Sequence, residues 1–103
     1  MHYQRIDPAR ETLAATPGWL LLEFGVDCCP HCRAGMVLSA GLLPHHPAIR
    51  HLAVEDGKGR RLGRAFGVKL WPAFILLRDG EEVGRVLRPT GVDELEALLN
   101  QAE

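Results

Sequence analysis

The fold is decided by the stretch Trp19-Leu20-Leu21-Leu22-Glu23-Phe24, which a short loop joins to Cys29-Pro30-His31-Cys32. The first part is an apolar run interrupted by one carboxylate, which is typical of a strand buried on both faces in the middle of a sheet. Pro30 suits the first turn of a helix, where its missing N–H has no partner to lose. We therefore predict a central strand, a loop and a helix that starts at the cysteines and continues to about Leu43.

Two cysteines three positions apart at the start of a helix can close a small disulfide ring. The free N–H groups and the partial positive charge of a helix N-terminus stabilise a thiolate on Cys29. Cys32 lies one turn inside the helix and is expected to be less exposed. The pattern predicts an attacking thiol at Cys29 and a resolving thiol at Cys32. The alternative is a pair of buried structural cysteines, but the strand before the pair and the helix after it favour redox chemistry.

The rest of the chain alternates helix and strand signals. Asp7 and Pro8 predict a helix start, with Asp7 as the capping residue, and this helix should end near Ala15. The remaining predicted elements are a strand Ile49–Glu55, a helix Lys58–Phe66, a buried strand Ala73–Arg78, a returning strand Glu82–Arg88 and a helix Val92–Ala102. In the last helix, the residues expected to face inward are Val92, Leu95, Leu98 and Leu99.

The order of these elements indicates an α/β fold. Strands separated by helices should run parallel, whereas Asp79-Gly80 predicts a tight antiparallel hairpin between the last two strands. The sequence has 103 residues, of which 47% are hydrophobic and 24% charged, as is ordinary for one compact domain spanning residues 1–103.

Charge and hydropathy exclude several classes of protein. The formal net charge of −1 provides no overall positive field for nucleic acid or for an anionic membrane surface. Segment 1–11 is polar and does not resemble a signal peptide, and the longest apolar run is far too short to cross a bilayer. We therefore expect a soluble, cytoplasmic monomer that binds neither nucleic acid nor membrane.

Two motifs together resemble the thioredoxin family. Leu22-Glu23-Phe24 followed by Cys29-Pro30-His31-Cys32 is similar to the family's passage from strand to active site. The segment from Phe66 to Pro72, followed by Ala73-Phe74-Ile75-Leu76-Leu77, is similar to its cis-proline passage. The resemblance implies a three-layer fold in which helices flank a mixed sheet of four or five strands. It also implies that Pro72 is cis and packs beside Cys29, and that the backbone of Trp71 forms an edge for an extended substrate segment.

Glu23 interrupts an apolar strand, where a carboxylate is expensive to bury without a purpose. In the family this position usually holds a buried aspartate that accepts the proton of the resolving cysteine. The resemblance therefore implies that Glu23 assists Cys32, although its side chain is one methylene longer. The alternative is an outward-facing residue near the end of the strand.

Pro30 and His31 separate this chain from the reducing thioredoxins, which usually carry Gly-Pro between the cysteines. Pro-His is similar to the bacterial periplasmic disulfide oxidases, and a charged imidazole would stabilise the Cys29 thiolate and raise the reduction potential. The segment between Cys32 and Pro72 is too short for the large helical insertion of those oxidases. The direction of electron flow, reduction or oxidation of substrates, stays open at this point.

Cys28 stands where thioredoxins usually have tryptophan, and it is either a third redox thiol or a small loop residue. The second interpretation is favoured, with Trp71 providing some of the missing aromatic cover. Zinc held by Cys28, Cys29, Cys32 and His31 is disfavoured, because no second pair of ligands completes a site.

These features predict dithiol–disulfide exchange between the Cys29–Cys32 pair and protein substrates, with a disulfide reductase or another electron partner and no cofactor or metal. The predicted site comprises catalytic Cys29, Cys32 and Glu23, potential-tuning Pro30 and His31, and substrate-binding Trp71 and Pro72. The alternative function is a protein-binding module of the same fold, in which the redox pair is incidental.

Overall fold

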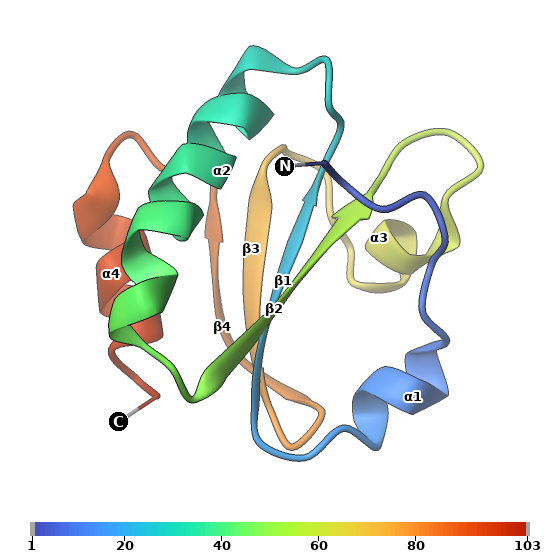
Figure 1. The fold of residues 1–103 in the computed structure, drawn as a ribbon. Coiled ribbons are helices and arrows are strands. Elements are labelled where there is room, and N and C mark those ends of the chain that lie inside the picture. The colour runs from blue at the N-terminus through green and yellow to red at the C-terminus, as the bar shows by residue number, and fades with distance from the viewer. Residues whose placement is uncertain (1, 103) are drawn as a thin grey trace.

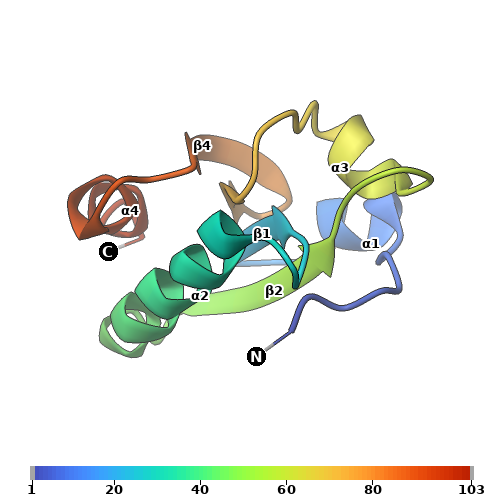
Figure 2. The ribbon, with the colours of Figure 1, turned by 90° about the horizontal axis from the view of Figure 1, so that it is seen from above.

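Residues 2–102 are described by a computed structural model, and they form a four-stranded mixed sheet between two layers of helices (Figures 1 and 2). The strand order is β2-β1-β3-β4. The elements are α1 (Arg10–Ala14), β1 (Trp19–Gly25), α2 (Pro30–Leu42), the 3-10 turn η1 (Leu43–His45), β2 (Ile49–Glu55), α3 (Arg61–Ala65), β3 (Ala73–Arg78), β4 (Glu81–Leu87) and α4 (Val92–Leu99). This architecture confirms the predicted fold class.

The central strand β1 is buried on both faces, as its apolar run predicted. Leu20, Leu22 and Phe24 pack in the core that faces α1 and α3. Leu21 belongs to the core on the opposite face, where the side chains of α2 and α4 pack. Because successive side chains of a strand point to opposite faces, Glu23 also faces α2. The sequence of β1 therefore places one carboxylate beneath the helix that begins at the cysteines.

The strand directions place the end of β1, the end of β2 and the start of β3 at the same end of the sheet. Because α2 and its cysteines follow β1 there, we call this the active end of the sheet. β1 pairs in parallel with β2, as expected for strands joined by a helix. However, β3 is also preceded by a helix, and it runs antiparallel to β1. The reason is that the connection from β2 through α3 starts and ends at the same end of the sheet, where the Trp71 indole donates a 2.8 Å hydrogen bond to Asp56. The chain can only run back from there.

The hairpin between β3 and β4 has the predicted two-residue turn. Asp79 and Gly80 both have positive φ, 50° and 84°, as a type I′ turn requires. A Cβ atom at Gly80 would collide with the backbone of Ala14, so this position has room only for glycine. Asp79 also accepts a 2.7 Å hydrogen bond from the N–H of Gly18, which ties the turn to the start of β1.

The prediction that Asp7 caps the first helix is wrong. α1 begins at Arg10, and its N-cap Ala9 makes no side-chain hydrogen bond. The carboxylate of Asp7 instead accepts a 3.2 Å hydrogen bond from the N–H of Leu62, in the first turn of α3. The free N–H groups of the other helix are the better partner, and only the folded chain brings them close.

Two more helices are shorter than predicted. α3 starts at Arg61 rather than Lys58, because Gly57 and Gly59 have φ values of 126° and 80°, which no right-handed helix contains. α4 ends at Leu99. The expectation that Val92 faces inward is also wrong, since this residue is 46% exposed at the start of α4.

The segment before α1 adds an isolated parallel bridge to the outer edge of β2, between Gln4 and Val54. The N–H of Gln4 bonds the carbonyl of Ala53, and the carbonyl of Gln4 accepts from the N–H of Glu55. This bridge fixes Tyr3 in a buried position near the start of α2. None of the helices within residues 2–102 has the length and apolar character needed to cross a membrane.

Candidate active site

Cys29 is the N-cap of α2, and its sulfur accepts a hydrogen bond from the N–H of Cys32 at 3.3 Å. Partial burial raises the pKa of the Cys29 thiol. Hydrogen bonds from the Cys32 side chain and from the N–H groups of Cys32 and His31, together with the positive charge of Arg88, outweigh that effect and leave the pKa below its usual value. Cys29 therefore forms a thiolate more readily than an ordinary cysteine.

Cys32 has no exposed surface and behaves in the opposite way. Burial is the largest influence on its thiol, and the hydrogen bond to the Cys29 sulfur adds to it, so that the pKa of Cys32 is raised to about 12. The geometry thus gives one accessible thiol that ionises easily and one buried thiol that keeps its proton.

Glu23 lies fully buried beneath α2, so the alternative of an outward-facing carboxylate does not hold. Its Oε2 accepts a 2.8 Å hydrogen bond from the hydroxyl of Tyr3. Its Oε1 accepts a 3.0 Å hydrogen bond from the hydroxyl of Ser39 and lies 2.8 Å from Nε2 of His51. These partners compensate the loss of water around the carboxylate.

Tyr3 joins Glu23 to the cysteine pair. Besides its bond to Glu23, the Tyr3 hydroxyl lies 3.5 Å from the carbonyl oxygen of Cys32. Burial and the adjacent Glu23 carboxylate raise the pKa of Tyr3 well above its usual range, so the phenol stays protonated. His51 sits at the other side of Glu23, and its side chain is 27% exposed, which connects the buried carboxylate to the surface.

Two glycines make room for these contacts. A Cβ atom at Gly25 would lie 2.7 Å from the sulfur of Cys32 and 2.7 Å from the ring of Tyr3. A Cβ atom at Gly35, on α2, would lie 2.7 Å from Cγ of Pro72. Both glycines therefore allow an approach that any larger residue would prevent.

Pro72 is fully buried, and the peptide bond between Trp71 and Pro72 is cis, as the resemblance implied. The proline lies against α2 at Gly35. Trp71 is half-buried and packs, like Cys29, against the cluster formed by Tyr3, Cys32 and Met36. The structure thus brings Trp71 and Pro72 to the helix that carries both cysteines.

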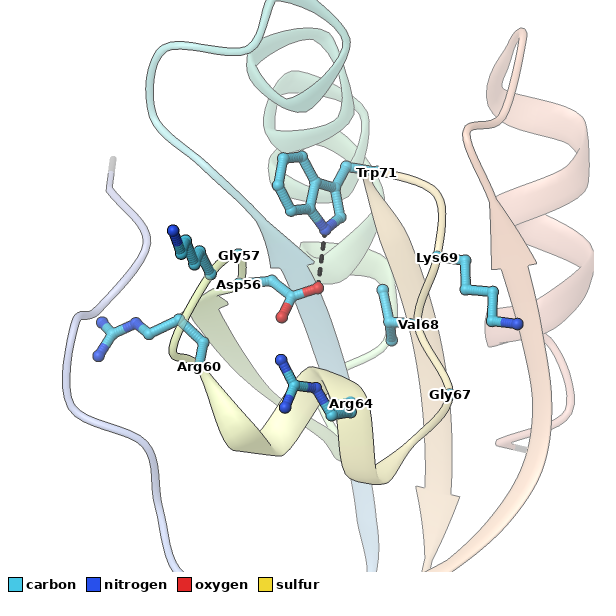
Figure 3. Close-up of a pocket in the computed structure, with 9 residues that line it drawn as sticks. Asp56, Gly57, Arg60, Arg64, Gly67, Val68, Lys69 and Trp71 are labelled. Atoms are coloured by element: carbon cyan, nitrogen blue, oxygen red, sulfur yellow. Dashed lines mark hydrogen bonds between the residues drawn. The ribbon is translucent and has the colours of Figure 1, made fainter.

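The indole of Trp71 forms one wall of a pocket of about 390 Å³ (Figure 3). Its Nε1–H donates to the buried carboxylate of Asp56, shown as the dashed line in Figure 3. Gly63 leaves the space that this carboxylate occupies, since a Cβ atom there would collide with it. The ring is therefore held in one orientation at the active end of the sheet.

Pro30, His31 and Cys28 are exposed beside the pair. The N–H of His31, rather than a contact of its ring, is the part of this residue that lowers the pKa of Cys29. Among residues 2–102, no group of three or more His, Cys, Asp or Glu side chains gathers closely enough to hold a metal ion.

Sequence reasoning missed the side chains that contact the pair, Glu23 or Trp71, namely Tyr3, Ser39, His51, Asp56 and Arg88. A signal existed for His51, because parallel pairing of Ile49–Glu55 with the central strand places it near Glu23. No local pattern marks Tyr3 or Arg88, since both reach the site from segments distant in sequence.

No protein-family model matches the chain. Thioredoxin 2 from Pseudomonas aeruginosa PAO1, solved in its reduced form, superposes with a TM-score of 0.88 at 48% sequence identity, covering 99% of this chain and 94% of that one. The chain belongs to the thioredoxin family. Its fold is the thioredoxin fold, and the domain is a thiol–disulfide oxidoreductase.

Curated thioredoxins are more distant in sequence. A thioredoxin of Chlamydia muridarum is 27% identical over 84 residues, covering 82% of each chain. Thioredoxin H2-1 of Oryza sativa is 27% identical over 81 residues, which are 79% of this chain but only 58% of the rice protein. The match therefore concerns the thioredoxin domain, and the rice relative is substantially longer than the region it shares with this chain.

Proposed function

We propose that this thioredoxin exchanges a dithiol and a disulfide between its Cys29–Cys32 pair and protein substrates. The observation that carries the proposal is the opposite behaviour of two thiols at the start of one helix. The pKa of Cys29 is lowered and that of Cys32 is raised to about 12. A nucleophile must be ionised and reachable, whereas a resolving thiol must wait until the mixed disulfide has formed.

In the reducing direction, the Cys29 thiolate attacks a substrate disulfide. A bond forms between Cys29 and one substrate sulfur, and the other substrate sulfur leaves as a thiolate. Cys32 then loses its proton and attacks the Cys29 sulfur, which closes the Cys29–Cys32 disulfide and releases the second substrate thiolate. The substrate gains two electrons from the Cys29–Cys32 pair. Its two sulfurs leave as thiolates that take up protons from the surrounding water, while the pair gives up the single proton of Cys32. Oxidation of a substrate dithiol is the reverse sequence.

Glu23 is the proposed acceptor of the Cys32 proton. Support comes from its burial beneath α2 and from the Tyr3 hydroxyl, which bonds Glu23 and also interacts with the Cys32 side chain. As Cys32 gives its proton to the Tyr3 oxygen, Tyr3 passes its own proton to Glu23, so the phenol is protonated before and after the step. His51 then offers a route from Glu23 to solvent.

The remaining roles concern substrates and potential. Trp71 and Pro72 are proposed to contact the substrate segment, because they lie at the helix that carries the pair. Pro30 and His31 are proposed to tune the reduction potential, and the Pro-His dipeptide favours a more oxidising pair than Gly-Pro would give. We further propose a single domain over residues 1–103, acting as a cytoplasmic monomer on protein disulfides, with a disulfide reductase or similar electron partner and no cofactor.

The proposal is tested by trapping the mixed disulfide and by measuring the rate of insulin reduction. Cys32→Ser should accumulate mixed disulfides between Cys29 and a model substrate such as oxidised insulin, because the resolving step is lost. Cys28→Ser is the matched control, and it should form none while reducing insulin with dithiothreitol at the unmodified rate. A protein that reduces no insulin above background would instead be a binding module. Equilibration with glutathione then gives the reduction potential and with it the direction.

A further inference from the structure

Arg88 follows the end of β4 and contacts the substrate edge with both its backbone and its side chain. Its N–H donates a 2.8 Å hydrogen bond to the carbonyl of Pro72. Its guanidinium Nε donates a 2.7 Å hydrogen bond to the carbonyl of Trp71. The residue is exposed, so nothing buried forces this arrangement. An exposed arginine thus bonds the backbone of Trp71 and Pro72, the segment beside which an extended substrate is expected to lie.

The backbone of Arg88 has a φ of 43°, in the left-handed region that favours glycine. Arg88 and Asp79 are the non-glycine residues with positive φ in the part of the chain that the structure describes. Asp79 is accounted for by the hairpin turn. Arg88 occupies a position better suited to glycine, and this is consistent with a use for its side chain.

The carbonyl of Trp71 is an acceptor that an incoming extended segment would use to pair with this edge. In the free protein that acceptor is already occupied by the guanidinium of Arg88. A substrate N–H that bonds this carbonyl competes with the guanidinium, and a displaced guanidinium is a free cation beside the bound segment. That cation is most stable when the substrate supplies a carboxylate, because arginine forms strong, geometrically matched pairs with carboxylates.

The surroundings also favour a negatively charged segment. The pocket beside Trp71 is lined by four cationic side chains, Lys58, Arg60, Arg64 and Lys69. The last three are labelled in Figure 3. Arg60 pairs with Glu55 at 3.0 Å, and the carboxylate of Asp56 is bonded to the Trp71 indole. Because the whole chain has a formal net charge of −1, this concentration of positive charge is local to the active end of the sheet.

We infer that Arg88 is a specificity-determining latch, which covers the Trp71 carbonyl in the free protein and, once displaced, selects substrate segments carrying a carboxylate beside the reacting disulfide. The inference rests on the proposed function, since it concerns the substrates of the Cys29–Cys32 pair. It assigns to this thioredoxin a preference for acidic protein segments.

The test uses two cyclic disulfide peptides that differ only in one residue next to a cysteine, Glu in one and Gln in the other. The reduced protein is mixed with each peptide, and the second-order rate constants of peptide reduction are compared as a ratio, Glu over Gln. We expect a ratio of about three for the unmodified protein in low salt, the effect of one partly exposed charge pair. The ratio should fall toward one in concentrated NaCl.

Arg88→Gln should lower the ratio clearly toward one, with the pocket cations leaving at most a small preference, whereas Arg88→Lys should keep a larger part of it. Arg78→Gln is the matched control: it removes the same charge from an exposed arginine that stacks on Trp19, far along β3 from the cysteines, and it should leave the ratio unchanged. A structural role for Arg88 would alter both rates together and not their ratio.

Equal ratios for the unmodified protein and Arg88→Gln, with both peptides reduced, would overturn the latch and leave the proposed function intact. Reduction of neither peptide by the unmodified protein would overturn the proposed function and the latch with it.

Discussion

The outer and inner sides of the active site hold the same kind of side chain in opposite surroundings. On the outer side, Cys29 lies at the helix start with the cation of Arg88 nearby. On the inner side, Cys32 lies fully buried near Tyr3 and the carboxylate of Glu23. N–H donors and the charge of Arg88 lower the pKa of Cys29, whereas burial and the neighbouring Cys29 sulfur raise the pKa of Cys32.

The difference teaches that reactivity here is set by position and not by residue type. The two cysteines are three positions apart, and the first turn of α2 separates a surface rich in N–H donors from the buried interior. One helix start therefore supplies both the nucleophile and the thiol that resolves its mixed disulfide. Each of the following experiments either removes the contrast between the two sides or measures it more finely.

Alkylation should show the largest difference. In a Cys28→Ser background, with the pair reduced, iodoacetamide should label Cys29 roughly a thousandfold faster than Cys32 near neutral pH. The pKa of Cys32 is raised to about 12 while that of Cys29 is lowered from 9.0, and each unit of pKa is a tenfold change in thiolate. Because the pKa of Cys29 is depressed, its labelling rate should rise and level off at lower pH than that of an ordinary cysteine. Peptide mapping gives both rates, and faster labelling of Cys32 would reverse the assigned roles.

Gly25→Ala should disrupt the packing of Cys32 and Tyr3 on the inner side and so destabilise the fold. The new methyl group would have to share space with the Cys32 sulfur and the Tyr3 ring, so we expect a loss of about 2–3 kcal/mol in the free energy of unfolding. Gly41→Ala, at an exposed position of α2 with nothing within 4 Å of its Cβ position, is the control. It should stabilise the protein by about 0.5–1 kcal/mol. Urea unfolding measures both, and equal effects would mean that the inner side is loosely packed.

Glu23→Gln should slow resolution about a hundredfold, at the low end of what a positioned base contributes, while leaving the attack by Cys29 nearly intact. The mixed disulfide should therefore accumulate transiently, which quenched-flow chromatography detects. Tyr3→Phe removes the hydroxyl that joins Glu23 to Cys32 and should slow the same step. If both variants resolve the mixed disulfide at the original rate, the carboxylate is a structural group only.

His31→Gly should produce the smallest change. The His31 side chain is exposed, and its N–H, which acts on Cys29, survives the substitution. We expect the reduction potential to fall by about 15 mV, a threefold change in the equilibrium constant for this two-electron couple. The pKa of Cys29 should rise by about half a unit, because the same threefold loss of thiolate stabilisation acts on both quantities. Equilibration with glutathione measures the potential, and a shift many times larger would mean that the imidazole dominates the outer side.

Much of the fold was predictable because its signals are local. The apolar run of β1, the Pro30 helix start and the Asp79-Gly80 turn all lie within a few residues of the structure they specify. The helix cap assigned to Asp7 failed for the complementary reason, since its partner Leu62 comes close only in the folded chain.

The same distinction applies to the site. The cysteine pair and Glu23 could be found from one stretch of sequence and a family resemblance. Tyr3 and Arg88 could not, because each is placed by hydrogen bonds to strands or loops far along the chain. Neither residue belongs to a motif, and periodicity carries no information on a contact made by a single side chain.

The bridge between Gln4 and Val54 has a practical consequence for anyone who handles the protein. It makes Tyr3 part of the floor of the active site, where its hydroxyl lies beside Glu23. A purification tag or fluorescent fusion attached just before this segment would lie next to Tyr3 and could alter its contacts with Glu23 and Cys32. The carboxyl end follows α4 at the opposite side of the ribbon in Figure 1 and is the safer place for such an attachment.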